Sequence, residues 1–247
     1  MPSTKDFNKN SAYKILLYAE NKFGKSIAAA SFFKAGPVRF WDFDGRMRPI
    51  NTYFPEADIS YETFDSDNFR SFLDELEKLQ DKCDYKTLVL DSVTSASNSC
   101  VVYQLKVKDK VKTGKGGLPA TSWDEINGET VLFTKMLEAC KLIHRKFNTN
   151  IIWTCHPVSK TIIDDSGSKR ITSLAAYGNK IPSIIPGYFD EIYNIQMEKV
   201  GIESYKRVVY TVPKNDFPGG TAMNLPNSFD ITGKNFYETL MGLIKWP

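Results

Sequence analysis

One eight-residue stretch constrains the fold of this chain more than any other feature. Residues 19–26 read A-E-N-K-F-G-K-S, which fits the pattern [A/G]-x4-G-K-[S/T]. An apolar run at residues 14–19 leads into the stretch, and an alanine-rich segment at residues 26–33, expected to be helical, follows it. A tight loop between a strand and a helix is the context that phosphate binding requires. The sequence therefore predicts an α/β fold built around this loop.

The chemistry of such a loop assigns roles to its residues. Its backbone N–H groups would face the β-phosphate of a nucleotide, and the next helix would direct its positive N-terminus at the same anion. Lys25 would neutralise phosphate oxygens, and the hydroxyl of Ser26 would hold Mg²⁺. We expect ATP and Mg²⁺ as cofactors, and a nucleotide-binding loop made of Ala19, Glu20, Asn21, Lys22, Phe23, Gly24, Lys25 and Ser26. The similar T-G-K-G-G at residues 113–117 lacks a hydroxyl residue after its lysine and is interpreted as a decoy.

The rest of the chain alternates predicted strands and helices. Strands are expected at residues 38–43, 86–90 and 151–154, and later at 191–195 and 207–212. Helices are expected over residues 130–147 and around the apolar positions from Phe69 to Leu79, the latter capped by Asp65 or Ser66. This order predicts a mostly parallel sheet with helices on both faces and antiparallel edge strands near the C-terminus.

Size and composition limit the alternatives. With 247 residues, of which 42% are hydrophobic and 25% charged, we expect a short tail (residues 1–12) and one domain (13–247) rather than a disordered chain. No apolar run approaches the ~20 residues that span a bilayer, so we expect no membrane association. Four cysteines without C-x-x-C spacing suggest a reducing, cytoplasmic setting. A net charge of +3 gives no general argument for nucleic acid.

Polar residues that end the predicted strands are candidates for chemistry. Asp91 follows the apolar T-L-V-L and would support Mg²⁺, although Asp91 or Ser92 could instead cap a helix. In W-D-F-D-G, Asp44 is the choice for orienting the attacking water, whereas Asp42 could meet the nucleoside or cap a turn. His156 follows I-I-W-T-C and could sense the γ-phosphate, or could be structural.

Together these segments resemble the RecA-type ATPase core. The closest likeness is to phage-encoded RecA-like nucleotide-binding proteins grouped with single-strand annealing (Sak-type) recombinases. In that family A-E-N-K-F-G-K-S corresponds to Walker A, L-V-L-D-S to Walker B, T-C-H to the polar sensor, and W-D-F-D-G to an acidic signature that usually ends in glutamate. V-P-K-N-D resembles the strand end whose lysine reaches a neighbour's nucleotide, which makes Lys214 a candidate trans finger or an ordinary surface lysine. The resemblance also implies a homo-oligomeric ring or filament.

Two basic segments are candidates for binding single-stranded DNA. The first carries Lys106, Lys108, Lys110, Lys112 and Lys115, and precedes Trp123, which could stack on a base or belong to the core. The second is a predicted loop at residues 164–170 that contains Lys169 and Arg170. The resemblance implies that both loops line a DNA channel. The alternative is solvated lysine loops without a ligand.

The expected function is ATP binding and hydrolysis coupled to single-stranded DNA, in phage recombination or replication. The catalytic candidates are Asp44, Lys25, His156 and Lys214, with Ser26 and Asp91 at the metal. Asp44 is one methylene shorter than the glutamate of the resembled family, so a nucleotide-gated binding module with little turnover is an alternative. A small-molecule P-loop kinase is less favoured because arginine is sparse where its lid would lie.

Overall fold

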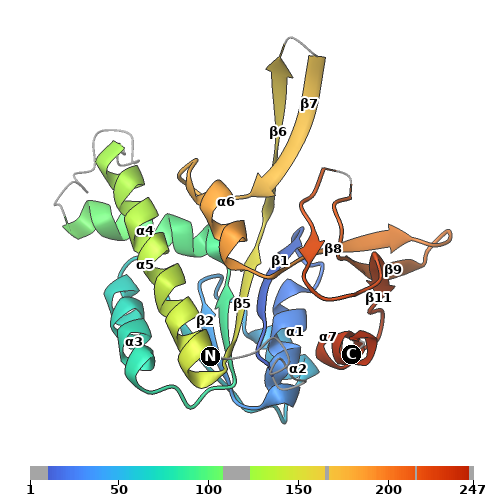
Figure 1. Cartoon of the computed structure of the whole chain (residues 1–247), viewed down its shortest axis with the longest axis horizontal. Helices are drawn as coiled ribbons and strands as arrows, with labels where there is room; N and C mark the ends of the chain where they lie inside the picture. The colour runs from blue at the N-terminus through green and yellow to red at the C-terminus, as the bar shows by residue number, and fades with distance from the viewer. Residues whose placement is uncertain (1–10, 108–122, 165–166, 215, 245–247) are drawn as a thin grey trace, which may run out of the picture.

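A twisted sheet forms the centre of the molecule (Figure 1). The computed structural model describes residues 11–107, 123–164, 167–214 and 216–244. The strands of the main sheet are β1 (Lys14–Ala19), β2 (Val38–Asp42), β3 (Ile59–Thr63), β4 (Thr87–Asp91), β5 (Asn150–Cys155), β8 (Glu191–Lys199), β9 (Tyr205–Tyr210), β10 (Gly220–Thr221) and β11 (Ser228–Asp230). Their order is β11-β9-β8-β1-β5-β4-β2-β3, with β10 paired to β8.

Parallel pairing dominates this sheet and confirms the predicted fold class. Strands β3, β2, β4, β5, β1 and β8 pair in parallel, whereas β9, β10 and β11 are antiparallel. Tyr18 of β1 is level with Cys155 of β5, and Asp42 of β2 is level with Asp91 of β4. The carboxyl ends of the central strands therefore meet at one edge, beside the loop that follows β1.

Helices cover both faces of the sheet. They are α1 (Lys25–Ala30), α2 (Arg48–Tyr53), α3 (Phe69–Asp81), α4 (Val93–Val107), α5 (Trp123–Phe147), α6 (Ile181–Ile184) and α7 (Phe236–Leu243), with 3-10 turns η2 (Ser31–Ala35) and η3 (Ile185–Tyr188). Along β5, Ile151 and Trp153 pack under α5, whereas Ile152 faces the opposite core with α1 and α7. Because both faces are buried, the central strands are continuously apolar. No helix within the described ranges has the length and apolar character needed to cross a membrane.

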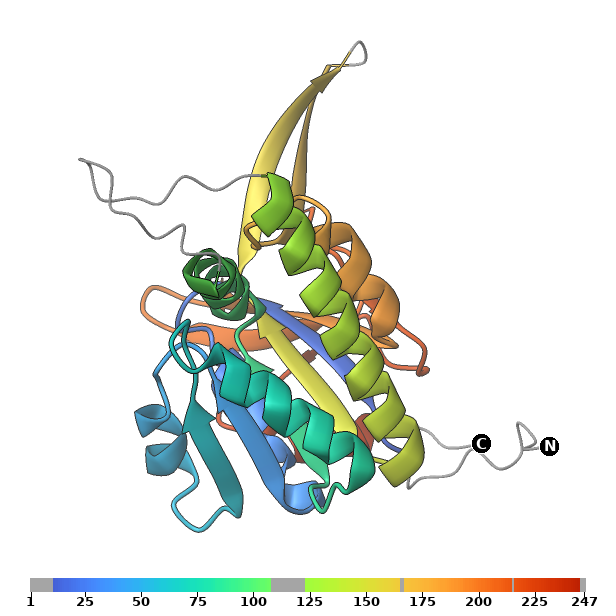
Figure 2. The same ribbon diagram turned by 90° about the vertical axis from the view of Figure 1, so that its left-hand side faces the viewer.

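A long hairpin projects from the body of the molecule. Its strands β6 (Pro157–Asp164) and β7 (Gly167–Leu174) form a separate two-stranded sheet that extends away from the main sheet in both views (Figures 1 and 2). The prediction of a loop at residues 164–170 is therefore wrong. Asp164 pairs with Gly167, and the pairing continues along both strands as far as Pro157 and Leu174. The described hairpin strands pair only with each other, so they lack the continuous apolar run by which a buried strand of the main sheet is recognised in the sequence.

Three smaller expectations also differ from the structure. The helix predicted over residues 130–147 begins earlier, at Trp123, and the edge strand β3 was not predicted. The N-cap of α3 is Asn68 rather than Asp65 or Ser66. Asp65 instead accepts hydrogen bonds from the backbone N–H groups of Asp67 (2.7 Å) and Asn68 (3.3 Å), so its carboxylate closes the preceding turn.

Candidate nucleotide-binding site

The loop between β1 and α1 has the backbone that phosphate binding needs. Gly24 is the N-cap of α1 and has a left-handed φ of +96°, a conformation that a glycine adopts without strain. Its carbonyl accepts the first helical hydrogen bond, from the N–H of Ala28 at 2.8 Å. Ala19, which stands where the pattern has its first glycine, is fully buried at the end of β1. The side chain of Ala19 thus fits into the core without opening the loop.

The ammonium group of Lys25 is buried and fully hydrogen-bonded. Its Nζ donates to the carbonyl oxygens of Ala19 (2.9 Å) and Glu20 (3.2 Å) and lies 3.2 Å from Nδ1 of His156. Burial lowers the pKa of Lys25, and nearby acids led by Asp91 oppose that shift. Since an ammonium has three protons, an incoming phosphate must compete with one of these three acceptors.

Ser26 and Asp91 lie side by side under the loop. Ser26 Oγ donates to Asp91 Oδ2 at 2.6 Å, and the hydroxyl of Thr154 donates to Oδ1. Asp91 is 2% exposed, and burial raises its pKa against these two hydrogen bonds. Either Asp91 or Ser92 was expected to be able to cap the next helix, and Ser92 does so: its Oγ accepts a hydrogen bond from the Ser95 N–H at 3.4 Å. The carboxylate of Asp91 instead faces Ser26.

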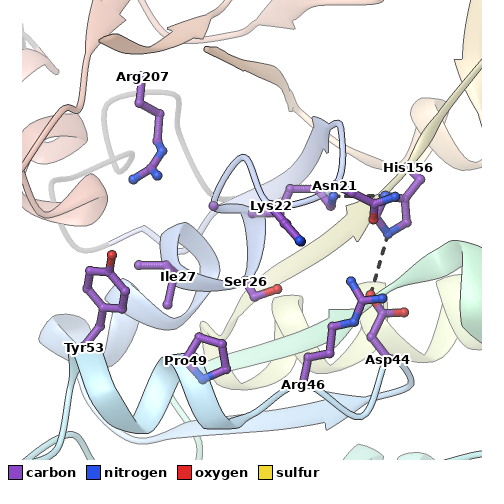
Figure 3. Close-up of a pocket in the computed structure, with 12 residues that line it drawn as sticks. Asn21, Lys22, Ser26, Ile27, Asp44, Arg46, Pro49, Tyr53, His156 and Arg207 are labelled. Carbon is purple, nitrogen blue, oxygen red and sulfur yellow. Dashed lines mark hydrogen bonds and ion pairs between the residues drawn. The ribbon is translucent and has the colours of Figure 1, made fainter. Parts of the chain in front are cut away.

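Three side chains hold the carboxylate of Asp44 in place. Ser92 Oγ donates to its Oδ1 at 3.0 Å, Ser95 Oγ donates to the same oxygen, and His156 Nε2 lies 3.6 Å from Oδ2 (Figure 3). Burial raises the pKa of Asp44, but the hydrogen bonds from His156 and the two serines outweigh it and lower the pKa to about 2. Because Lys25 donates to Nδ1 of His156, the imidazole proton is on Nε2 and faces Asp44.

Asp42, which was expected either to meet the nucleoside or to cap a turn, caps the turn that follows β2. Its Oδ1 accepts from the N–H groups of Asp44 (3.0 Å) and Gly45 (2.8 Å), and its Oδ2 accepts from the Arg46 N–H at 2.9 Å. These bonds shape the turn that presents Asp44 to the cavity.

Comparisons with known proteins give the family and the fold of this chain. A family described as "AAA domain" matches residues 11–223. The chain belongs to this AAA domain family. Among solved structures it is similar to the crystal structure of the RadB recombinase, with 14% identity, a TM-score of 0.52 and coverage of 91% of this chain and 90% of that chain. No curated protein matches the sequence. Family and fold together show that the chain is an AAA domain with a RecA-like fold.

The cavity of this AAA domain has a volume of about 250 Å³. It is lined by Asn21, Lys22, Gly24, Lys25, Ser26, Ile27, Asp44, Arg46, Pro49, Tyr53, His156 and Arg207. Asp44 and His156 lie at one end, and Ile27, Tyr53 and Arg207 lie at the other (Figure 3). Among the residues that line the cavity, cationic side chains outnumber acidic ones, so the cavity is suited to binding a polyanion.

The sequence did not single out Arg46, Tyr53 or Arg207. Arg46 follows the D-F-D-G turn, so its proximity to Asp44 gave a usable signal. Tyr53 is 63% exposed and comes from α2, which the sequence pattern did not predict. Arg207 comes from β9, two strands beyond β1 in the sheet, and only the sheet order brings it over the loop.

Two further candidates with described side chains, Lys214 and Lys106, are not among the residues that line the cavity. Lys214 Nζ donates to Glu198 at 2.9 Å and to the hydroxyl of Tyr210, whose ring it also covers at 3.9 Å. Lys106, near the end of α4, donates to Ser66 at 2.8 Å and forms an ion pair with Asp67. Residues Lys108, Lys110, Lys112 and Lys115 are outside the described residues, and of Trp123, Lys169 and Arg170 only the backbone is described, in α5 and β7.

Proposed function

We propose that this AAA domain protein binds ATP with Mg²⁺ and hydrolyses it. The contact of Lys25 with both the phosphate loop and His156 carries this proposal, since it ties the loop to the ends of two neighbouring strands. The donor set suits the metal: Ser26 already donates its proton to Asp91, so the lone pairs of its oxygen are free for a cation. Mg²⁺ held by Ser26, and by Asp91 through water, would neutralise the phosphate charge.

The roles of the side chains follow from their positions in the cavity. Lys25 would exchange its bond with His156 for one with a phosphate oxygen. Asp44 would accept a hydrogen bond from the attacking water and so orient it, since its carboxylate is fixed by Ser92 and Ser95. His156, released from Lys25, would then report whether the γ-phosphate is present.

Two contacts connect this site to the segments proposed to bind single-stranded DNA. The backbone N–H of His156 donates to Thr94 Oγ1 at 3.3 Å, in the first turn of α4, which leads to the lysine-rich residues 106–115. The carbonyl oxygen of His156 accepts a hydrogen bond from the N–H of Ala175 at 2.8 Å. This bond closes the base of the β6–β7 hairpin, which carries Lys169 and Arg170. A change at His156 would therefore reach both segments.

The biological setting is proposed by likeness. The similar solved structure is that of a recombinase, and the motifs resemble phage annealing proteins, so we propose a role in phage DNA recombination or replication. By the same resemblance, the protein would assemble into a ring or filament, with Lys214 reaching a neighbour's nucleotide. All four cysteines are unpaired, which supports a cytoplasmic location.

The test is ATP hydrolysis with and without single-stranded DNA, using Lys25→Ala as the blank. Turnover that DNA stimulates and that the blank lacks would support the proposal. Turnover that DNA leaves unchanged would refute the coupling, and ADP formation that depends on a small phosphate acceptor would indicate a kinase.

One observation favours a second function, a nucleotide-gated binding module with little turnover. A carboxylate whose pKa is about 2 is a weak base, so Asp44 can orient water but is a poor acceptor of its proton at neutral pH. ATP-dependent DNA binding without ADP formation would support this function, and hydrolysis gained by Asp44→Glu would link it to the shorter side chain.

A further inference from the structure

Arg207 of β9 lies directly on the phosphate loop. A Cβ placed on Gly24 would be 3.1 Å from both Cζ and Nε of Arg207, so the guanidinium packs on the bare backbone of that glycine. A side chain at position 24 would crowd this contact. Gly24 therefore serves two needs, its left-handed φ and the approach of Arg207.

The guanidinium has no anionic partner among the residues that the structure describes. Its Nε is buried and donates to no protein acceptor there, and no carboxylate of the described chain lies within ion-pair distance of it. The lysine and arginine side chains that line the cavity with it, Lys22, Lys25 and Arg46, have the same charge. A half-buried, unpaired guanidinium is costly, and an anion bound beside it would remove that cost.

The position of Arg207 within the cavity indicates which part of a nucleotide it would meet. It lies with Ile27 and Tyr53, at the end away from Asp44 and His156, whereas Arg46 lies beside Asp44 (Figure 3). In the proposed function the γ-phosphate occupies the Asp44 end. The phosphate nearest the nucleoside then falls under Arg207.

We propose that Arg207 binds the α-phosphate of a nucleoside di- or triphosphate within its own subunit. This inference rests on the proposed function. Planar N–H donors suit phosphate oxygens, and the contact is the same for ATP and ADP because both have an α-phosphate. The antiparallel strands after β8 thus complete a site whose other parts come from the parallel core.

Equilibrium binding of Mg–ATP and Mg–ADP to the full chain, measured by calorimetry, tests this assignment. Arg207→Gln, which keeps the stem over Gly24 but removes the charge, should raise the Kd for both nucleotides by the same factor, about tenfold or more. Arg207→Lys should recover part of the affinity. Arg46→Ala should weaken ATP more than ADP. The matched control is Lys206→Ala, an exposed neighbour on β9 outside the cavity, which should stay within twofold.

Three results would overturn the assignment: a change below twofold in Arg207→Gln, weakening of ATP alone, or equal losses in Arg207→Gln and Arg207→Lys. Thermal unfolding without nucleotide shows whether each variant is folded. A wild-type protein that binds neither nucleotide would instead refute the proposed function.

Discussion

Replacing Asp44 with asparagine tests the electrostatics of the site without any ligand. The substitution keeps the shape of the side chain and an oxygen that can accept from Ser92 and Ser95, but it removes the charge. The pKa of Asp44 falls from its ordinary 3.8 to about 2 in the folded protein, so folding favours the ionised form. The Asp44 side chain is only 10% exposed, so solvent screens this effect weakly.

The magnitude follows from proton linkage. A folded-state pKa below the unfolded value contributes stability that is complete above the unfolded pKa and is lost as the pH falls through the folded pKa. Each pH unit of difference corresponds to ~1.4 kcal/mol, so the carboxylate contributes about 2 kcal/mol at pH 7. The same linkage leaves about half of this contribution at pH 3 and little at pH 2.

Urea denaturation of the wild type and Asp44→Asn at a series of pH values measures this contribution. We expect the variant to be less stable by about 2 kcal/mol at pH 7, with the difference shrinking by about 1 kcal/mol between pH 5 and pH 3. Asp74→Asn is the matched control, because Asp74 forms an exposed pair with Arg70 and its loss should leave the stability close to that of the wild type. A difference for Asp44→Asn that is below about 0.5 kcal/mol or independent of pH would refute the reasoning.

Three other substitutions test the fold and the coupling. The Arg39 guanidinium donates two hydrogen bonds to the Glu75 carboxylate (2.6 Å each) and one to the Glu62 carboxylate (2.8 Å). Glu75→Ala removes the first two, and denaturation should show a loss of stability of about 3 kcal/mol, whereas a loss below about 1 kcal/mol would mean that the bond to Glu62 is sufficient. Asn194→Leu removes two buried polar atoms that have no partner among the described residues, so Tm should rise by about 2 °C, and a fall would point to an ordered water. His156→Ala should retain ATP binding but lose stimulation of hydrolysis by DNA, and stimulation that persists would argue against His156 as the connection.

The sequence predicts the centre of this fold well because burial there is complete. Strands β1, β4 and β5 are covered on both faces, so each appears as an unbroken apolar run followed by a polar residue. Parallel pairing then brings the residues after these runs to one edge. For this reason the proximity of Lys25, Asp91 and His156 could be predicted from spacing alone, although their chemical roles stay predictions.

Prediction was poorer at the edge of the main sheet and outside it. Edge strand β3 buries none of its five residues fully, and the β6–β7 hairpin pairs only with itself, so neither shows the apolar run of a core strand. Helix α2 is short and begins beside a proline, with only Ile50 buried. Such segments depend on contacts that are distant in sequence or on their own hydrogen bonds, and hydrophobic periodicity reports neither.

The two ends of the cavity also differ in how well the sequence predicts them. The end with Lys25 and Asp44 is built from residues that follow parallel strands, where motif and position agree. The other end depends on Arg207, which the antiparallel register of β9 with β8 places beside Gly24. A shift of one residue in that register would turn Arg207 to the other face of the sheet and bring Lys206 or Val208 to the loop. The fit of the nucleotide to its site would therefore depend on strand pairing as well as on the phosphate loop.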